Sequence, residues 1–115
     1  MLIDNGQCIN LITNELNNNG KISLTVHGNS MFPTLNDGET VTVIKSEQYN
    51  IGDIIAYYTI TDNLVTIIVH RVIFTRSKYV LTKGDNNSFV DPLKINLCSI
   101  LGKVEKEQIR DNVTI

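Results

Sequence analysis

The sequence lacks any apolar run long enough to cross a membrane as a helix. Its longest apolar stretch, residues 65–69, contains Thr66 and ends at His70, whereas a spanning helix needs about 20 apolar residues. The first residues also lack the basic segment and the long apolar core of a secretory signal. We therefore expect a cytoplasmic protein with no membrane anchor in this chain.

An excess of one charge sign is also missing, and cysteine is scarce. Ten basic residues oppose twelve acidic ones, so the net charge is −2 and no basic patch predicts contact with nucleic acid. Cys8 and Cys98 do not have the spacing of a metal or redox motif, and we expect both to be small buried side chains. A disulfide between them is the alternative, which the sequence does not decide. No metal and no other cofactor is implied.

The length and the hydrophobic pattern predict one domain, residues 1–115, that begins with a helix. The 115 residues are 42% hydrophobic, as is ordinary for a globular domain. Apolar side chains between residues 8 and 16 recur three or four positions apart, which predicts a helix over about residues 5–18. Gly20 follows a run of asparagines and is a typical helix stop.

The rest of the chain, about residues 21–105, shows the patterns of β-strands. Ile22, Leu24 and Val26 alternate with polar residues, as in a strand with one buried face. Many short strands at regular spacing predict a closed or half-closed, mainly β architecture. We expect residues 105–115 to be frayed. The further predicted strands, of which the second and third form a hairpin around residues 61–63, are residues 40–44, 54–60, 64–74, 77–82 and 100–104.

Five short stretches place chemically reactive side chains beside turn residues. A serine hydroxyl becomes a good nucleophile when a base lies beside it and a third group orients that base. The stretches contain Ser30, His70, Asp85 and Asp91, which supply all three parts. The five stretches are residues 28–34, 52–55, 69–72, 81–87 and 90–91.

Ser30 is the candidate nucleophile and His70 the candidate base. Gly28 allows a tight turn that exposes the Ser30 hydroxyl, although a serine in a turn often bonds only its own backbone. His70 ends an apolar strand and exchanges protons near neutral pH, although such a histidine can equally belong to the core. His27, three residues before Ser30, is a rival base that the alternation of a strand disfavours. A serine–lysine pair is the other rival, and it would use Lys45 or Lys83.

Together the stretches resemble the type I signal peptidase and LexA-like serine peptidase superfamily. The motifs are Ser-Met-x-Pro, Gly-Asp-Ile, His-Arg-Val and Lys-Gly-Asp-Asn-Asn followed by Asp, and they lie within residues 26–91. The resemblance is strongest to the Ser-His-Asp branch, the endoplasmic-reticulum and archaeal-type signal peptidases. It implies coiled antiparallel sheets that form a partly closed barrel, with one N-terminal helix, and a serine endopeptidase that acts by acyl transfer.

The resemblance also assigns roles to residues of this chain. His70 stands where bacterial signal peptidases carry a lysine base. Asp91, six positions after Asp85, has the spacing of the usual histidine partner, whereas Asp85 either shares that work or holds its loop. Some relatives carry a hydroxyl two residues before the nucleophile to stabilise the oxyanion. Gly28 lacks it, which leaves the N–H of Ser30 as the natural donor.

The expected substrate is an extended peptide or protein segment that pairs with the strands before Ser30 and His70. Members of the resembled family normally carry membrane anchors, whereas we expect none in this chain. We therefore expect a specialised role, such as the processing of a leader or precursor. The alternatives are a LexA-like domain that cleaves itself or dimerises, and an interaction module without catalysis. The expected substrate-binding residues are Leu24, Val26, Met31, Ile67 and Val69.

Overall fold

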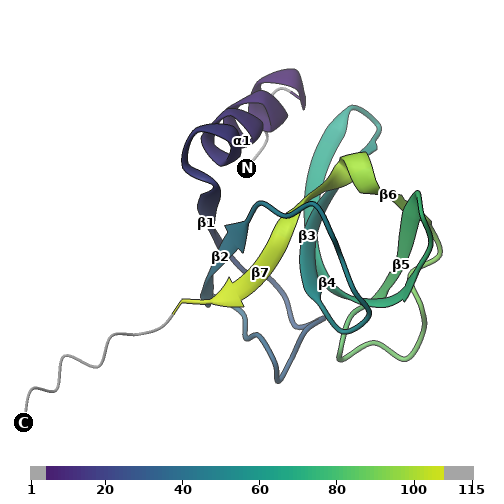
Figure 1. Ribbon diagram of the computed structural model, residues 1–115. Coiled ribbons are helices and arrows are strands. Elements are labelled where there is room, and N and C mark those ends of the chain that lie inside the picture. Colours follow the sequence, from purple (N-terminus) through teal and green to yellow (C-terminus); the bar gives the residue numbers. More distant parts are fainter. Residues whose placement is uncertain (1–4, 108–115) are drawn as a thin grey trace, which may run out of the picture.

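The computed structural model describes residues 5–107, which form one helix and a coiled antiparallel sheet (Figure 1). The strands follow one another across the sheet in the order β1-β2-β7-β3-β4-β5-β6. The sheet is not closed, because β1 and β6 are its two edges in the described part of the chain. The predicted mainly β fold with an N-terminal helix is therefore confirmed. The elements are α1 (Asn5–Asn19), β1 (Lys21–Thr25), β2 (Thr40–Ile44), β3 (Ile54–Thr61), β4 (Leu64–Thr75), β5 (Tyr79–Lys83), β6 (Ile95–Asn96), the 3-10 turn η1 (Leu97–Ser99) and β7 (Ile100–Lys106).

The predicted hairpin is formed by β3 and β4, which pair from Ile54↔Arg71 to Thr61↔Leu64. Two residues, Asp62 and Asn63, make its turn with φ values of 51° and 63°. Asp and Asn tolerate this left-handed conformation better than most residues, and the two-residue turn then matches the twist of the strands. The hairpin matters for the site because β4 carries His70.

Several predictions of local structure need correction. The short strand β6 was not expected, and β7 continues to Lys106, where we predicted a frayed end. Cys98 is exposed in η1, so the prediction of a buried side chain was wrong for this residue. The side chain of Cys8 lies outside the described part of the structure, as do residues 108–115. None of the described helices is long and apolar enough to span a membrane.

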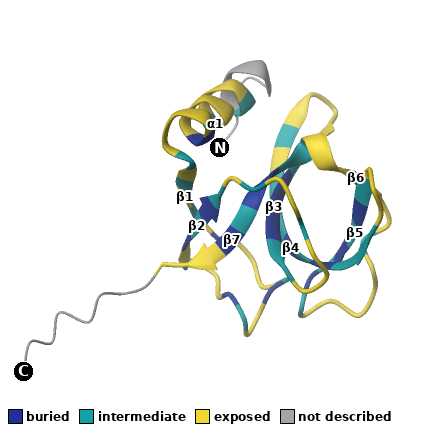
Figure 2. Cartoon of the chain, in the orientation of Figure 1, coloured by how far each residue is buried: buried dark blue, intermediate teal, exposed yellow. Residues whose placement is uncertain are grey.

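Buried side chains form two clusters within the coiled sheet, and Figure 2 shows them as dark blue segments along the central strands. The larger cluster joins Leu16 of α1 to β2, β7 and the loop that follows β1. Gly102 of β7 belongs to this tight packing, since a Cβ atom there would lie 2.3 Å from the carbonyl oxygen of Ile44. The smaller cluster is formed by side chains of β3, β4, β5 and β6, namely Ile55, Tyr57, Val72, Val80 and Ile95.

Candidate active site

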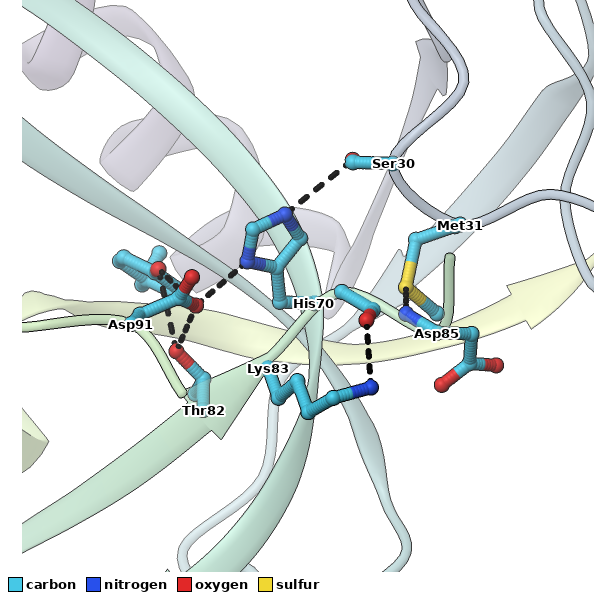
Figure 3. Close-up of polar contacts among 9 residues, drawn as sticks. Ser30, Met31, His70, Thr82, Lys83, Asp85 and Asp91 are labelled. Atoms are coloured by element: carbon cyan, nitrogen blue, oxygen red, sulfur yellow. Dashed lines mark hydrogen bonds and ion pairs between the residues drawn. The ribbon is translucent and has the colours of Figure 1, made fainter. Parts of the chain in front are cut away.

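Ser30 lies in the loop between β1 and β2, just after a sharp turn at Gly28. Gly28 has a φ of +87°, a conformation that side chains other than glycine rarely adopt. Its N–H donates a hydrogen bond to Asp37 Oδ1 at 2.8 Å, which fixes the turn from the far end of the same loop. The main chain therefore bends immediately before Ser30, and the hydroxyl of Ser30 points toward β4 (Figure 3).

His70 lies between Ser30 and Asp91, and it contacts both (Figure 3). Its Nε2 atom is 3.1 Å from Ser30 Oγ, and its Nδ1 atom is 2.5 Å from Asp91 Oδ2. Because an ionised carboxylate only accepts hydrogen bonds, Nδ1 carries the proton in this contact. In the neutral ring, Nε2 then has the free lone pair, and it faces the serine hydroxyl. The three residues thus have the arrangement of nucleophile, base and orienting acid.

The carboxylate of Asp91 has two further neighbours that sequence reasoning missed. Thr82 Oγ1 of β5 donates to Asp91 Oδ2 at 2.6 Å, and Tyr57 OH of β3 approaches the same oxygen at 3.4 Å. Burial, together with the negative charge of Asp91, raises the pKa of Tyr57 to about 12, although the hydrogen bond to Thr82 opposes this rise. Both hydroxyls occupy positions facing the core, where polar side chains need a partner.

Asp85 is held elsewhere, away from His70. Arg71 donates to it with Nε and one terminal nitrogen, both at 2.8 Å, and Thr34 Oγ1 donates at 2.6 Å. The hydrogen bonds from Arg71, supported by the one from Thr34, hold the pKa of the Asp85 carboxyl at about 2, against the opposing effect of burial. The Asp85 N–H also contacts Met31 Sδ at 3.3 Å. Asp85 therefore ties the loop of Ser30 to the strand of His70.

The Lys-Gly-Asp-Asn-Asn segment packs against the back of the Ser30 loop. Asn86 N–H donates to the carbonyl oxygen of Ser30 at 2.8 Å, and the Asn86 side chain donates to the carbonyl oxygen of Asn29 at 3.0 Å. A Cβ atom added to Gly84 would lie 2.6 Å from the Ser30 carbonyl oxygen and 3.1 Å from His70 Nε2. Glycine is thus required for the close approach of this segment, a role that we did not predict.

The rival bases do not contact Ser30. His27 lies on the groove described below, but the hydroxyl of Ser30 bonds with His70. Lys45 donates to Asn17 Oδ1 at 2.7 Å, and Lys83 donates to the carbonyl oxygen of Gly84 at 3.2 Å. Of these candidate bases, His70 is the one whose side chain contacts the hydroxyl of Ser30 within residues 5–107.

A groove of about 870 Å³ leads from Ser30 and His70 along β4 toward the tip of the hairpin. Its walls are β4, the end of β1 and the Leu11–Ile12 side of α1. Met31 is not part of it, because its side chain is only 1% exposed and packs in the larger core cluster. Four of the five expected substrate-binding residues do lie on the groove, namely Leu24, Val26, Ile67 and Val69.

Both strands beside the groove have free backbone edges. Within residues 5–107, β1 is an edge strand of the sheet and pairs only with β2. β4 pairs with β3 over Leu64 to Arg71, but its pairing with β5 begins at Arg71. The part of β4 before His70 therefore leaves one edge unpaired toward the groove. No cluster of three or more His, Cys, Asp or Glu side chains placed to hold a metal ion exists among the described residues.

Comparison with protein families matches residues 4–105 to the family described as Peptidase S24-like. No curated protein and no solved structure matched the chain. The matched range contains Ser30, His70, Asp85 and Asp91, together with strands β1 to β6 and all of β7 except Lys106. It also agrees at the level of the superfamily with the resemblance of the motifs. Since the match covers nearly the whole sequence, the chain belongs to the Peptidase S24-like family.

Proposed function

We propose that this chain is a serine endopeptidase that cleaves an extended peptide segment by acyl transfer. The observation that carries the proposal is the continuous chain of contacts from Ser30 Oγ through His70 to Asp91, placed at one end of an apolar groove. Ser30 is the nucleophile, His70 the general base and acid, and Asp91 the group that orients His70. Asp85 is assigned a structural role, because its carboxylate is bound by Arg71 and Thr34.

The proposed reaction moves one proton back and forth through His70. Ser30 Oγ forms a bond to the carbonyl carbon of the substrate while its proton passes to His70 Nε2, and the π electrons of the carbonyl move to its oxygen. When the tetrahedral intermediate collapses, the C–N bond breaks and Nε2 gives the proton to the leaving amine. Water then repeats the sequence on the acylated serine, which releases the carboxylic acid and restores the hydroxyl.

The oxyanion formed in each step needs a hydrogen-bond donor near Ser30. The backbone N–H of Ser30 makes no hydrogen bond within residues 5–107, so this donor is free for an incoming oxygen. Gly28 has no side chain to assist. Removing one such donor costs about 100- to 1,000-fold in turnover in a well-studied peptidase, so we expect one main-chain donor to support catalysis at a modest rate.

The groove supports a peptide or protein as the substrate. A segment in extended conformation can form main-chain hydrogen bonds with the free edges of β1 and β4, and its alternate side chains then enter the groove. Leu24 and Val26 lie on one wall and Ile67 and Val69 on the other. The walls therefore favour apolar substrate side chains. Processing of a leader or precursor peptide fits these features.

A serine-directed phosphonate probe tests the proposal directly. We expect covalent labelling at Ser30, mapped by mass spectrometry, and no labelling of Ser30→Ala or of heat-unfolded protein. Incubation with a defined peptide library then identifies the bonds that are cut. Labelling that persists in Ser30→Ala would contradict the proposal. Shortening of the chain itself, at a rate independent of its concentration, would instead favour a self-cleaving domain.

A further inference from the structure

One oxygen of Asp91 receives all the hydrogen bonds of its carboxylate. Oδ2 contacts His70 Nδ1 at 2.5 Å, Thr82 Oγ1 at 2.6 Å and Tyr57 OH at 3.4 Å. Figure 3 shows the contacts of His70 and Thr82 meeting at the carboxylate of Asp91. Oδ1 makes no hydrogen bond with any residue of the described range 5–107. The two oxygens of Asp91 therefore differ completely in their surroundings.

The direction of the hydrogen bonds follows from counting protons. A threonine hydroxyl has one proton, and in the short contact with Asp91 Oδ2 Thr82 is the donor. Tyr57 also has one proton, which can point to Thr82 Oγ1 at 3.2 Å or to Asp91 Oδ2 at 3.4 Å, but not to both. Thr82 Oγ1 is the nearer acceptor, so the assigned directions are that Tyr57 donates to Thr82 and Thr82 donates to Asp91. The raised pKa of Tyr57 keeps its hydroxyl protonated across the neutral range.

We propose that Thr82, supported by Tyr57, is a positioning residue that fixes which atom of residue 91 faces His70. Asp91 lies in a loop outside the strands, and within residues 5–107 its carboxylate has hydrogen-bond partners other than His70 only in Thr82 and Tyr57. Thr82 and Tyr57 instead lie on β5 and β3, at 0% and 2% exposure. Functional groups are held most accurately by such packed strands. The kinetic consequence rests on the proposed peptidase function, but the orientation does not.

The proposal leads to an unusual expectation for Asp91→Asn. In a well-studied triad, this type of change turns the amide N–H₂ toward the histidine and reverses its tautomer. Here both Thr82 and His70 need an acceptor at the same place, and an amide can supply only its oxygen. The introduced amide should therefore keep its oxygen toward His70 and its N–H₂ on the unbonded side. His70 should remain protonated on Nδ1, with Nε2 free for Ser30.

Nitrogen NMR of the imidazole rings tests this without any need for activity. The spectra are recorded on ¹⁵N-labelled protein at a pH at which the ring is neutral, and His27→Gln assigns the signals of the second histidine. We expect Asp91→Asn alone to keep the Nδ1–H tautomer of His70. In Asp91→Asn combined with Tyr57→Phe and Thr82→Val, we expect a large share of the Nε2–H tautomer. The proposal would be overturned if His70 had the same tautomer in Asp91→Asn and in the triple variant, or if Asp91→Asn alone already changed His70 to the Nε2–H tautomer.

A kinetic comparison in the chain with Asp91 intact completes the test. Loss of hydrogen bonds to a charged group should lower kcat by about 10- to 100-fold in Tyr57→Phe/Thr82→Val, with KM changed little. Tyr57→Phe and Thr82→Val preserve the shapes of the two side chains, and a thermal melt confirms that the double variant folds. Thr82→Ser lacks the methyl group but keeps the hydroxyl, so its kcat should stay much closer to that of the wild type than the kcat of the double variant. An unchanged kcat would refute the positioning role, whereas a wild-type chain without any peptidase activity would refute the proposed function and leave the NMR test valid.

Discussion

Arg71 and Asp85 form a bidentate ion pair with two hydrogen bonds, each 2.8 Å long. Bidentate pairs between arginine and a carboxylate are among the stronger polar contacts in proteins. Arg71 directly follows His70 on β4, and a third nitrogen of its side chain donates to the carbonyl oxygen of Gly52 at 2.7 Å. Asp85 also accepts from Thr34, four residues after Ser30. This pair therefore joins the strand that carries His70 to the loop that carries Ser30, and it gives Asp85 different partners from those of Asp91.

Asp85→Asn should destabilise the fold more than it affects the chemistry. The change removes the charge that Arg71 pairs with and leaves a partly buried guanidinium without its counter-ion. We expect a loss of about 2 kcal/mol in the free energy of unfolding, measured by urea titration. Asp62→Asn, on the exposed turn of the hairpin, is a matched control that should change stability little. Equal stability of the two variants would show that the ion pair contributes nothing.

The same carboxylate predicts a loss of stability in acid. Because the pKa of Asp85 is about 2 in the folded chain and about 4 when unfolded, the unfolded state takes up a proton first as the pH falls. The stabilisation, about 2 kcal/mol, is fully present above pH 4 and disappears between about pH 4 and pH 2. The difference in unfolding free energy between wild type and Asp85→Asn should shrink over this window. A difference that stays constant down to pH 2 would contradict the assignment.

Strands were predictable from the sequence where their pattern was long enough. Alternation gave β2 its observed bounds, Thr40–Ile44, and the turn residues Asp62 and Asn63 marked the hairpin. β6 was not predicted because it has only two residues, Ile95–Asn96, which are too few to show an alternating hydrophobic pattern. Met31 was assigned to the groove because it follows Ser30, but neighbouring residues of a turn point in different directions, and its side chain enters the core.

The hydrogen-bond partners of Asp91 were not predicted from the sequence, for a different reason. Thr82 and Tyr57 are 9 and 34 positions from Asp91 along the chain, and only the register of β3, β4 and β5 brings them together. A usable signal did exist, because each hydroxyl lies within an apolar run where a buried polar group needs a partner. The catalytic roles of Ser30, His70 and Asp91 remain predictions that rest on geometry and on the family resemblance.

Gly84→Ala should disable the site although it adds only one methyl group. The new Cβ atom would lie 2.6 Å from the backbone carbonyl oxygen of Ser30, so the loop of Ser30 must shift, and 3.1 Å from His70 Nε2, a contact tight enough to press on the imidazole ring as well. Displacement of a reacting group by about 1 Å can cost about 100-fold in rate. We expect at least this loss in the rate of phosphonate labelling at Ser30, measured by mass spectrometry.

Ser88→Ala is the control for Gly84→Ala, because Ser88 is an exposed residue of the same loop. Its labelling rate and melting temperature should stay close to those of the wild type. If Gly84→Ala labels as fast as Ser88→Ala, then the segment behind Ser30 does not fix the geometry of the site, and the close approach of Gly84 has no functional consequence.

Replacing His70 by glutamine and replacing His27 by glutamine should have very different effects on activity. Glutamine is polar like histidine, but it cannot act as a base near neutral pH. His70→Gln removes the group that contacts both Ser30 and Asp91, so turnover should fall by several orders of magnitude. His27→Gln alters an exposed residue on the groove wall and should change KM more than kcat. Peptide cleavage by the two variants, together with their melting temperatures, decides the assignment. If His27→Gln were inactive but folded while His70→Gln retained turnover, the base would have to reach Ser30 from the loop after β1, and the contacts from Ser30 through His70 to Asp91 would be structural.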